Sequence, residues 1–238
     1  MSNNIEFTGE FMVPGMTGDR IEADHYARYR FAESYVGGKR VLDAACGTGY
    51  ASEILRKAGA RSYKGVDINP VLAKHGTDVW GKEKVTFEEG DVTKLTFSEE
   101  FDVITCFETI EHVAQYKKAI ERLKAALVPG GTLLISSPNR LVTTPKTTLT
   151  DPPGNKFHTQ EFTVDELVNI LKDSGFDVAP DARFGQRQHA VLFWRIIKRI
   201  ARLFSQKING PEHFSSPNVT SIRWKTPRYF LIVATKKL

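Results

Sequence analysis

Residues 41–49 read VLDAACGTG, an apolar run that contains one aspartate and leads into a turn with two glycines. The apolar residues predict a buried strand over Arg40–Ala45, and the following segment predicts a helix over Tyr50–Lys57. A glycine turn between a strand and a helix lets a nucleoside lie close against the backbone. This stretch therefore predicts a nucleoside-binding edge of an α/β sheet.

The rest of the chain continues the alternation of short apolar runs with helix-period segments, which is typical of a doubly wound, mostly parallel sheet. The further strands expected are Tyr63–Asp67, Val85–Glu89, Phe101–Cys106, Thr132–Ser136, Phe176–Val178 and Tyr229–Thr235. The further helices expected are Pro70–Lys74, Gln115–Leu127 and one that begins at a Thr163–Glu166 capping box and runs to Leu171.

The glycine turn departs from the dinucleotide-binding pattern in two ways. Ser52 stands where the third glycine of that pattern would fall, and Asp43 lies on the strand just before the turn. A carboxylate there would repel a pyrophosphate, but it suits a ligand with a sulfonium and an α-amino group.

Acidic residues also follow the next two predicted strands. Asp67 is placed to accept hydrogen bonds from both hydroxyls of a ribose. Asp91 is placed to accept from an adenine amino group, while Val92 or Ile68 covers the ring. Any one of these acids could simply cap a turn, but together with the glycines they indicate one ligand.

The motifs DAACGTG (43–49), VD (66–67), GDV (90–92), FETIEH (107–112) and LVPGG (127–131) resemble those of the class I S-adenosylmethionine (SAM) dependent methyltransferases. The resemblance covers residues 37–175. It implies a Rossmann-like sheet of seven strands whose last strand, Tyr229–Thr235, is antiparallel. The residues expected to bind SAM are Asp43, Ala45, Gly47, Gly49, Asp67, Ile68, Asp91, Val92 and Glu108.

The acceptor chemistry is expected to depend on the residues that follow the fourth strand. Spacings of three and four bring Glu108, Glu111 and His112 within reach of one point if the segment turns helically, and His158 could join them. The E-x-x-E-H motif and a later histidine resemble ubiquinone-pathway and small-RNA 3′-end O-methyltransferases. That resemblance implies that these four residues hold Mg²⁺ or another divalent cation. The alternative is a metal-free general base, His112 or His158.

The composition predicts one methyltransferase domain over residues 1–238. It divides into an N-terminal helical lid (1–36), a SAM-binding core (37–137), an active-site loop (138–160) and a C-terminal part (161–238). The lid resembles the leader of bacterial surface-glycan pathway methyltransferases, and its Tyr26, Arg28, Tyr29 and Arg30 could meet the SAM carboxylate or the acceptor. The opening residues lack a secretory signal and no run is apolar enough for a membrane span, so we expect a cytoplasmic protein.

The basic charge of the chain is concentrated at its C-terminal end. Residues 1–180 carry 21 basic and 26 acidic groups, whereas residues 181–238 carry 12 basic and two acidic groups. Residues 190–206 predict an amphipathic basic helix. This helix could bind an anionic membrane surface or RNA phosphates, or it could pack on the domain itself or across a homodimer interface. No RNA-recognition module is visible.

The sequence therefore predicts a methyltransferase that most resembles O-methyltransferases of small molecules, with a sugar, natural-product or phenol-like hydroxyl as the acceptor. Three rivals remain at this stage. They are a small-molecule N-methyltransferase, an RNA 2′-O-methyltransferase that uses the basic C-terminal part, and a SAM-binding module without activity.

Overall fold

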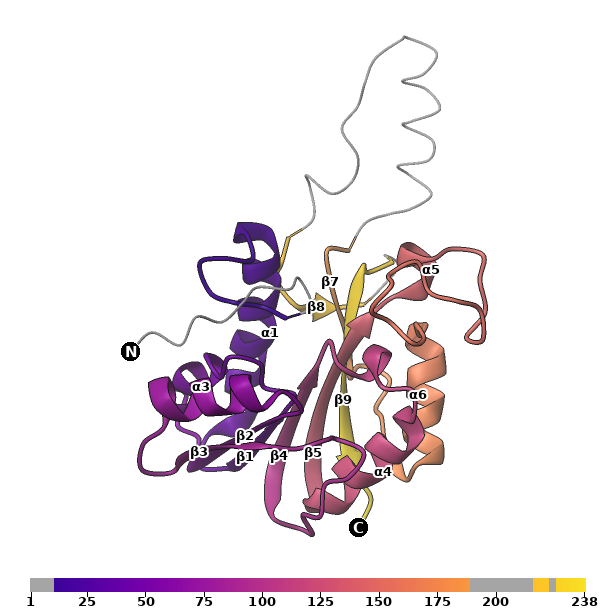
Figure 1. Ribbon diagram of the computed structural model, residues 1–238. Helices are drawn as coiled ribbons and strands as arrows, with labels where there is room; N and C mark the ends of the chain where they lie inside the picture. The colour runs from indigo at the N-terminus through magenta and orange to yellow at the C-terminus, as the bar shows by residue number, and fades with distance from the viewer. Residues whose placement is uncertain (1–10, 189–215, 223–225) are drawn as a thin grey trace.

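The structure, a computed structural model, describes residues 11–188, 216–222 and 226–238. One sheet forms its centre, with the strand order β3-β2-β1-β4-β5-β9-β7-β8 and with β6 paired to β9 (Figure 1). The strands are β1 Arg40–Ala44, β2 Ser62–Asp67, β3 Val85–Glu89, β4 Phe101–Phe107, β5 Leu127–Pro138, β6 Phe176–Asp177, β7 Arg183–Gln186, β8 Thr220–Ser221 and β9 Tyr229–Lys236. The helices are α1 Asp19–Val36, α2 Ala51–Lys57, α3 Pro70–Trp80, α4 Tyr116–Ala126, α5 Arg140–Thr143, α6 Val164–Asp173 and the 3-10 helix η1 Ile110–His112.

The Rossmann-like α/β fold predicted from the sequence is confirmed. Strands β3, β2, β1, β4 and β5 are parallel, and β9 is antiparallel to β5. The described residues form nine strands instead of the seven expected, because β7 and β8 were not predicted. The predicted strand Phe176–Val178 is the two-residue β6, which pairs with β9, and the two-residue β8 pairs with β7.

Two elements are longer than their sequence patterns predicted. Helix α3 continues past Lys74 to Trp80. Strand β5 begins at Leu127, before the expected Thr132, because a shift in its register with β4 accommodates the Pro-Gly-Gly stretch within the strand. Gly130 has φ +74° there, a conformation that glycine adopts without steric cost.

Helices cover both faces of the sheet, with α1, α2 and α3 on one face and α4 and α6 on the other (Figure 1). Neighbouring residues of the central strands alternate between the two cores. Val41 packs toward α1 and α2, whereas Leu42 packs toward α4 and α6, and both are fully buried. Burial on both faces is the usual state of a parallel sheet, and it explains why these strands read as apolar runs.

The segment expected as a structureless active-site loop, residues 138–160, is partly regular. Asn139 caps the short helix α5 by accepting from the backbone of Leu141. Arg140 is buried and donates to the backbone of Glu161 and Thr147 and to the carboxylate of Glu166. The prediction of an irregular segment is therefore wrong at residues 140–143, because a buried arginine fixes the backbone there.

The predicted basic helix 190–206 lies outside the described residues. Membrane contact, nucleic-acid contact and a dimer interface through it therefore stay predictions. Within the described ranges, no helix combines the length and apolar character needed to cross a membrane.

The capping box at the start of α6 is present as predicted. The Thr163 hydroxyl accepts from the backbone of Glu166, whose carboxylate accepts from the backbone of Thr163. We expect Thr163→Ala to lower the free energy of unfolding by about 1 kcal/mol, because a helix donor loses its partner. Thr163→Ser keeps the hydroxyl and should remain near wild type in urea unfolding. Equal stability of the alanine variant would contradict this role.

Candidate active site

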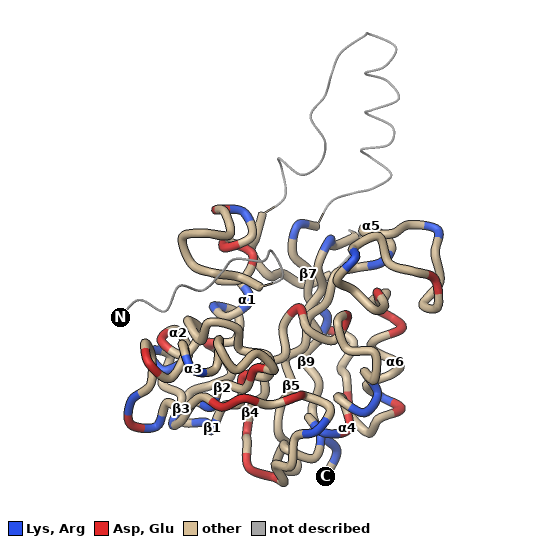
Figure 2. Tube along the Cα trace, viewed as in Figure 1, with Lys and Arg blue, Asp and Glu red and all other residues tan. Residues whose placement is uncertain are grey.

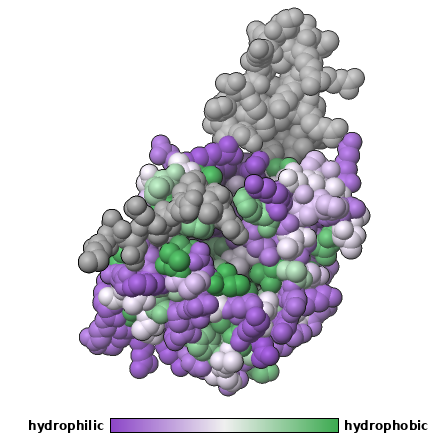
Figure 3. Space-filling model, in the orientation of Figure 1, coloured by the Kyte–Doolittle hydropathy of each residue, from purple (hydrophilic) through white to green (hydrophobic). Residues whose placement is uncertain are grey.

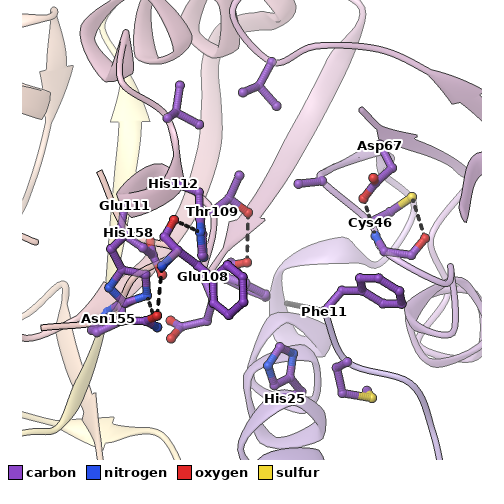
Figure 4. A pocket seen from close by; sticks show the side chains of 18 of the residues that line it. Phe11, His25, Cys46, Asp67, Glu108, Thr109, Glu111, His112, Asn155 and His158 are labelled. Atoms are coloured by element: carbon purple, nitrogen blue, oxygen red, sulfur yellow. Dashed lines mark hydrogen bonds between the residues drawn. The ribbon is translucent and has the colours of Figure 1, made fainter. Parts of the chain in front are cut away.

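A cavity of about 1150 Å³ opens at the carboxyl ends of β1, β2, β3 and β4. Figure 3 shows apolar surface, in green, gathered near the middle of this face between hydrophilic regions. Ile21, Ile68 and Phe157 line the cavity and have exposed apolar side chains. The cavity has two chemically different ends, which Figure 4 shows around Asp67 and around His112.

The first end is formed by the glycine turn. Gly47 and Gly49 have φ of +56° and +78°, and Ala45 also has positive φ, at +63°. A Cβ on Gly49 would lie 2.5 Å from the ring of Phe87, so a side chain there would force the ring to move. Ala45, Cys46 and Gly47 line the cavity. The turn thus presents backbone to the cavity, as a nucleoside cradle requires.

The carboxylate of Asp67 lies against this turn. It accepts from the backbone N–H of Gly47 at 2.8 Å and from that of Asn69 at 2.9 Å. Asp67 is only 7% exposed, yet it lines the cavity beside Ile68, which is 68% exposed. These positions fit the predicted contacts with a ribose and with one face of an adenine.

Asp91 and Val92 line the same end of the cavity. Asp91 accepts from the backbone N–H and the hydroxyl of Thr93, both at 2.8 Å. Partial burial acts to raise the pKa of Asp91, but the bonds from Thr93 and the nearby ammonium of Lys94 hold it below its ordinary value. The group is therefore a charged acceptor at the cavity wall, as the adenine contact predicts.

Asp43 has a different position from the one its sequence pattern predicted. It is fully buried and is not among the residues that line the cavity. Its carboxylate accepts from the hydroxyls of Tyr29 at 3.1 Å, Tyr63 at 2.7 Å and Thr105 at 2.6 Å. Asp43 therefore supports the glycine turn from beneath, and in this structure it offers no direct contact to a ligand.

Glu108 lies between the two ends of the cavity (Figure 4). Its backbone has φ +49°, a strained conformation for a residue with a side chain, and Ser136 stabilises it. The Ser136 hydroxyl lies 3.1 Å from the backbone N of Glu108 and donates to its carboxylate at 2.7 Å. The buried guanidinium of Arg28 lies 3.9 Å from the same carboxylate. Glu108 therefore already has two partners.

Arg28 is a buried cation that lines the cavity. It donates to the side chain of Gln186 at 2.7 Å and lies over the ring of Tyr229 at 5.6 Å. Its Nε is buried and has no hydrogen-bond partner among the described residues. Arg28 was one of four lid residues expected near the ligands, whereas nothing in the sequence pointed to Gln186 or Tyr229.

Glu111 lies at the second end, on the 3-10 helix η1, where it is 1% exposed. Neither of its carboxylate oxygens has a hydrogen-bond partner among the described residues. Burial, and then the nearby carboxylate of Glu108, raise the pKa of Glu111 well above its ordinary value. A buried acid without partners is costly, and it is ready to accept a cation or a proton donor.

Two imidazoles lie beside Glu111. The rings of His112 and His158 meet edge to face, with their centroids 4.9 Å apart. Each of the three side chains offers one ligand atom, and these atoms all lie within 4.8 Å of one another. The structure thus brings together three of the four residues predicted to hold a metal. Glu108 is not in this group, because its carboxylate is bonded to Ser136.

The protonation of His112 follows from its neighbour. Its Nδ1 lies 2.9 Å from the carbonyl oxygen of Phe157, which can only accept, so Nδ1 carries a proton and Nε2 is the unprotonated nitrogen whenever the ring is neutral. Histidines that ligate metals usually donate their second N–H to a carbonyl or carboxylate in this way.

Glu161 is a residue that the sequence analysis missed. It is 2% exposed and accepts from Nδ1 of His158 at 2.8 Å and from the hydroxyls of Thr143 and Thr144. Burial acts to raise its pKa, but these three hydrogen bonds hold the pKa below its ordinary value. The only signal for Glu161 in the sequence is its place three residues after His158.

A sequence-family model described as "Methyltransferase domain" matches residues 24–180. The chain belongs to the class I SAM-dependent methyltransferases. The matched residues include most of α1, the strands β1 to β6 and both ends of the cavity. SAM is the cofactor of this family, and the glycine turn with Asp67, Asp91 and Val92 fits its nucleoside half.

Curated relatives agree with this membership. A probable SAM-dependent methyltransferase of Mycolicibacterium smegmatis is 30% identical over 73% of this chain and 66% of its own length. A mitochondrial ubiquinone biosynthesis O-methyltransferase of Schizosaccharomyces pombe is 31% identical over 58% of this chain and 55% of its own length. The chain spans 63–66% of the length of the first curated relatives that it matches.

Solved structures share the fold of this methyltransferase. A SAM-dependent methyltransferase from Mesorhizobium loti superposes with a TM-score of 0.62 at 18% identity, covering 90% of this chain and 98% of that one. Magnesium protoporphyrin IX methyltransferase from Synechocystis, with bound SAH, gives a TM-score of 0.56 at 17% identity and covers 92% and 83% of the two chains.

The buried Asp43 makes the stability of this methyltransferase depend on pH. Burial raises the pKa of Asp43 to about 6, whereas the unfolded group titrates near 3.8. As the pH falls from 7 to 4, the folded state takes up this proton before the unfolded state does, so this group makes unfolding harder. We expect the free energy of unfolding of the wild type to rise relative to that of Asp43→Asn, by up to about 3 kcal/mol.

Urea unfolding of both proteins at several pH values measures this difference. The comparison with Asp43→Asn removes the effect of the other acids, several of which have lowered pKa values and act in the opposite direction. A difference that stays constant between pH 7 and pH 4 would show that Asp43 is not the titrating group.

Proposed function

We propose that this chain transfers a methyl group from SAM to a hydroxyl oxygen of a small-molecule acceptor. The observation that carries the proposal is the group of Glu111, His112 and His158 in the same cavity as the nucleoside cradle. Two imidazoles and an unpartnered carboxylate form a set that can take a proton from a hydroxyl or hold a cation beside it. The ubiquinone biosynthesis O-methyltransferases among the relatives support an oxygen acceptor.

The first end of the cavity, at the glycine turn, is the cofactor end, and it needs only to bind and orient SAM. SAM supplies an electrophilic methyl group on a positively charged sulfur. Asp67 would accept from the ribose hydroxyls, and Asp91 from the adenine amino group. Arg28 is a buried cation whose Nε has no hydrogen-bond partner among the described residues, so it could bind the carboxylate of the methionine half.

The second end of the cavity, at Glu111, is the acceptor end. It must remove the proton of the acceptor hydroxyl and align the hydroxyl oxygen. During transfer the carbon–sulfur bond breaks and its electron pair stays on sulfur, while a new oxygen–carbon bond forms. The acceptor proton leaves the oxygen, and the unprotonated Nε2 of His112 is suited to receive it.

As the alternative to this metal-free base, we propose that Glu111, His112 and His158 hold a divalent cation such as Mg²⁺; the Nε2 lone pair of His112 would then bind the cation and would not receive the acceptor proton. Positive charge there makes a nearby hydroxyl easier to deprotonate. The two unpartnered oxygens of Glu111 and the lone pair of His112 fit this role. His158 would take part by exchanging its bond with the amide of Asn155 for the cation.

The cofactor assignment can be tested at Asp67. We expect Asp67→Ala to weaken SAM binding by about 10- to 100-fold, because a charged hydrogen-bond acceptor is lost. Glu89→Ala is the matched control, since Glu89 lies opposite Asp67 in the sheet but is exposed and does not line the cavity. Isothermal titration with SAM measures the affinity of both variants. Equal affinities would refute the assignment of Asp67 to the SAM site.

The cation is tested by its removal. Labelled SAM is supplied with pools of phenols, sugar nucleotides, amines and short RNAs, with and without EDTA. We expect transfer to a hydroxyl compound, a loss of at least about 10-fold in EDTA and recovery on adding Mg²⁺. Full activity after complete metal removal would refute the cation, and transfer only to amines or RNA would refute the acceptor class.

A further inference from the structure

We propose that Glu161 is a positioning residue that keeps the proton of His158 on Nδ1 and so makes Nε2 the accepting nitrogen of an imidazole that lines the acceptor end of the cavity. The proposal deepens the function proposed above and rests on it for its kinetic consequences. Its structural part, the tautomer of His158, stands on the hydrogen bonds alone.

The tautomer is determined first from the side of Nδ1. A carboxylate such as that of Glu161 can only accept, and it lies 2.8 Å from Nδ1 of His158. Glu161 is charged and almost fully buried, so this bond is not shared with solvent. Nδ1 must therefore be the protonated nitrogen.

The side of Nε2 leads independently to the same assignment. The Oδ1 of Asn155 accepts from the backbone N–H of Phe157 at 3.1 Å, which orients the amide. Its Nδ2 then faces Nε2 of His158 at 2.9 Å, and an amide nitrogen can only donate. Nε2 is thus the acceptor. Figure 4 shows Asn155 and His158 side by side, next to Glu111.

Glu161 also joins this imidazole to the segment that forms the wall of the cavity. The second oxygen of its carboxylate accepts from the hydroxyls of Thr143 and Thr144 at the end of α5. The Thr144 hydroxyl in turn accepts from the backbone of Gly154, next to Asn155. A closed ring of hydrogen bonds therefore fixes both the orientation of His158 and the segment that faces it.

A half-buried carboxylate bound to the same segment provides a control. Glu166 also holds this segment, by accepting from Arg140, but it makes no contact with His158 that the structure records. A variant at Glu166 therefore loosens the segment without touching the imidazole. Comparing the two separates anchoring of the segment from positioning of His158.

The first measurement is the tautomer in the wild-type protein. Protein labelled with ¹⁵N at histidine gives long-range ¹H–¹⁵N spectra in which the protonated ring nitrogen is identified, and the His158→Ala variant assigns the signal. We expect the proton on Nδ1. A proton on Nε2 would overturn the proposal, whether or not the protein transfers methyl groups.

The second measurement compares Glu161→Gln with Glu166→Gln. We expect Glu161→Gln to lower kcat by about 10- to 100-fold, as loss of such an outer partner does, while the Kd for SAM is unchanged. Glu166→Gln should change kcat by less than about 3-fold. Equal losses in both variants would make Glu161 an anchor of the segment only and would overturn the positioning role.

The two proposals fail in distinguishable ways. A wild type that binds SAM but methylates no hydroxyl compound contradicts the proposed function, and the tautomer measurement still decides the role of Glu161. If Glu161→Gln does not fold, as circular dichroism would show, the wild-type spectrum alone decides it.

Discussion

The buried carboxylate of Asp43 is the constraint on which the donor half of the site depends. A buried charge is tolerated only when hydrogen bonds replace its water, and here the donors are Tyr29, Tyr63 and Thr105. They come from α1, β2 and β4, so one carboxylate fixes the lid helix and two strands around β1. Because Tyr29 is held there, Arg28 on the same helix lies beside Glu108 at the end of β4.

The donor half was predictable from the sequence because its parts follow successive strands. The glycine turn, Asp67 and Asp91 lie at the carboxyl ends of three strands, and these ends of parallel strands meet at one edge of the sheet. Local pattern was enough to place them in one cavity. The role of Asp43 was not predictable, because it is decided by hydroxyls 14, 20 and 62 residues away in the chain.

The acceptor half could not be predicted from the sequence alone, because two segments that are distant in the chain form it. The backbone carbonyl of Glu111 accepts from Thr159 and Gln160, and this pairing brings His158 against His112. Nothing in the spacing of 46 residues between the two histidines specifies that contact. Figure 2 shows an acidic stretch, in red, beside β2 and β4, with basic and acidic segments mixed over the rest of the described chain.

Two buried glutamates at the acceptor end show how partners decide the state of a group. Glu161 and Glu111 are almost equally buried, at 2% and 1% exposure. Glu161 accepts three hydrogen bonds and its pKa is lowered, whereas Glu111 has no side-chain partner among the described residues and its pKa is raised. A fold retains an unsatisfied buried acid only where something compensates its cost. At Glu111 the raised pKa itself reduces that cost, because burial favours the neutral, protonated acid over the charged carboxylate.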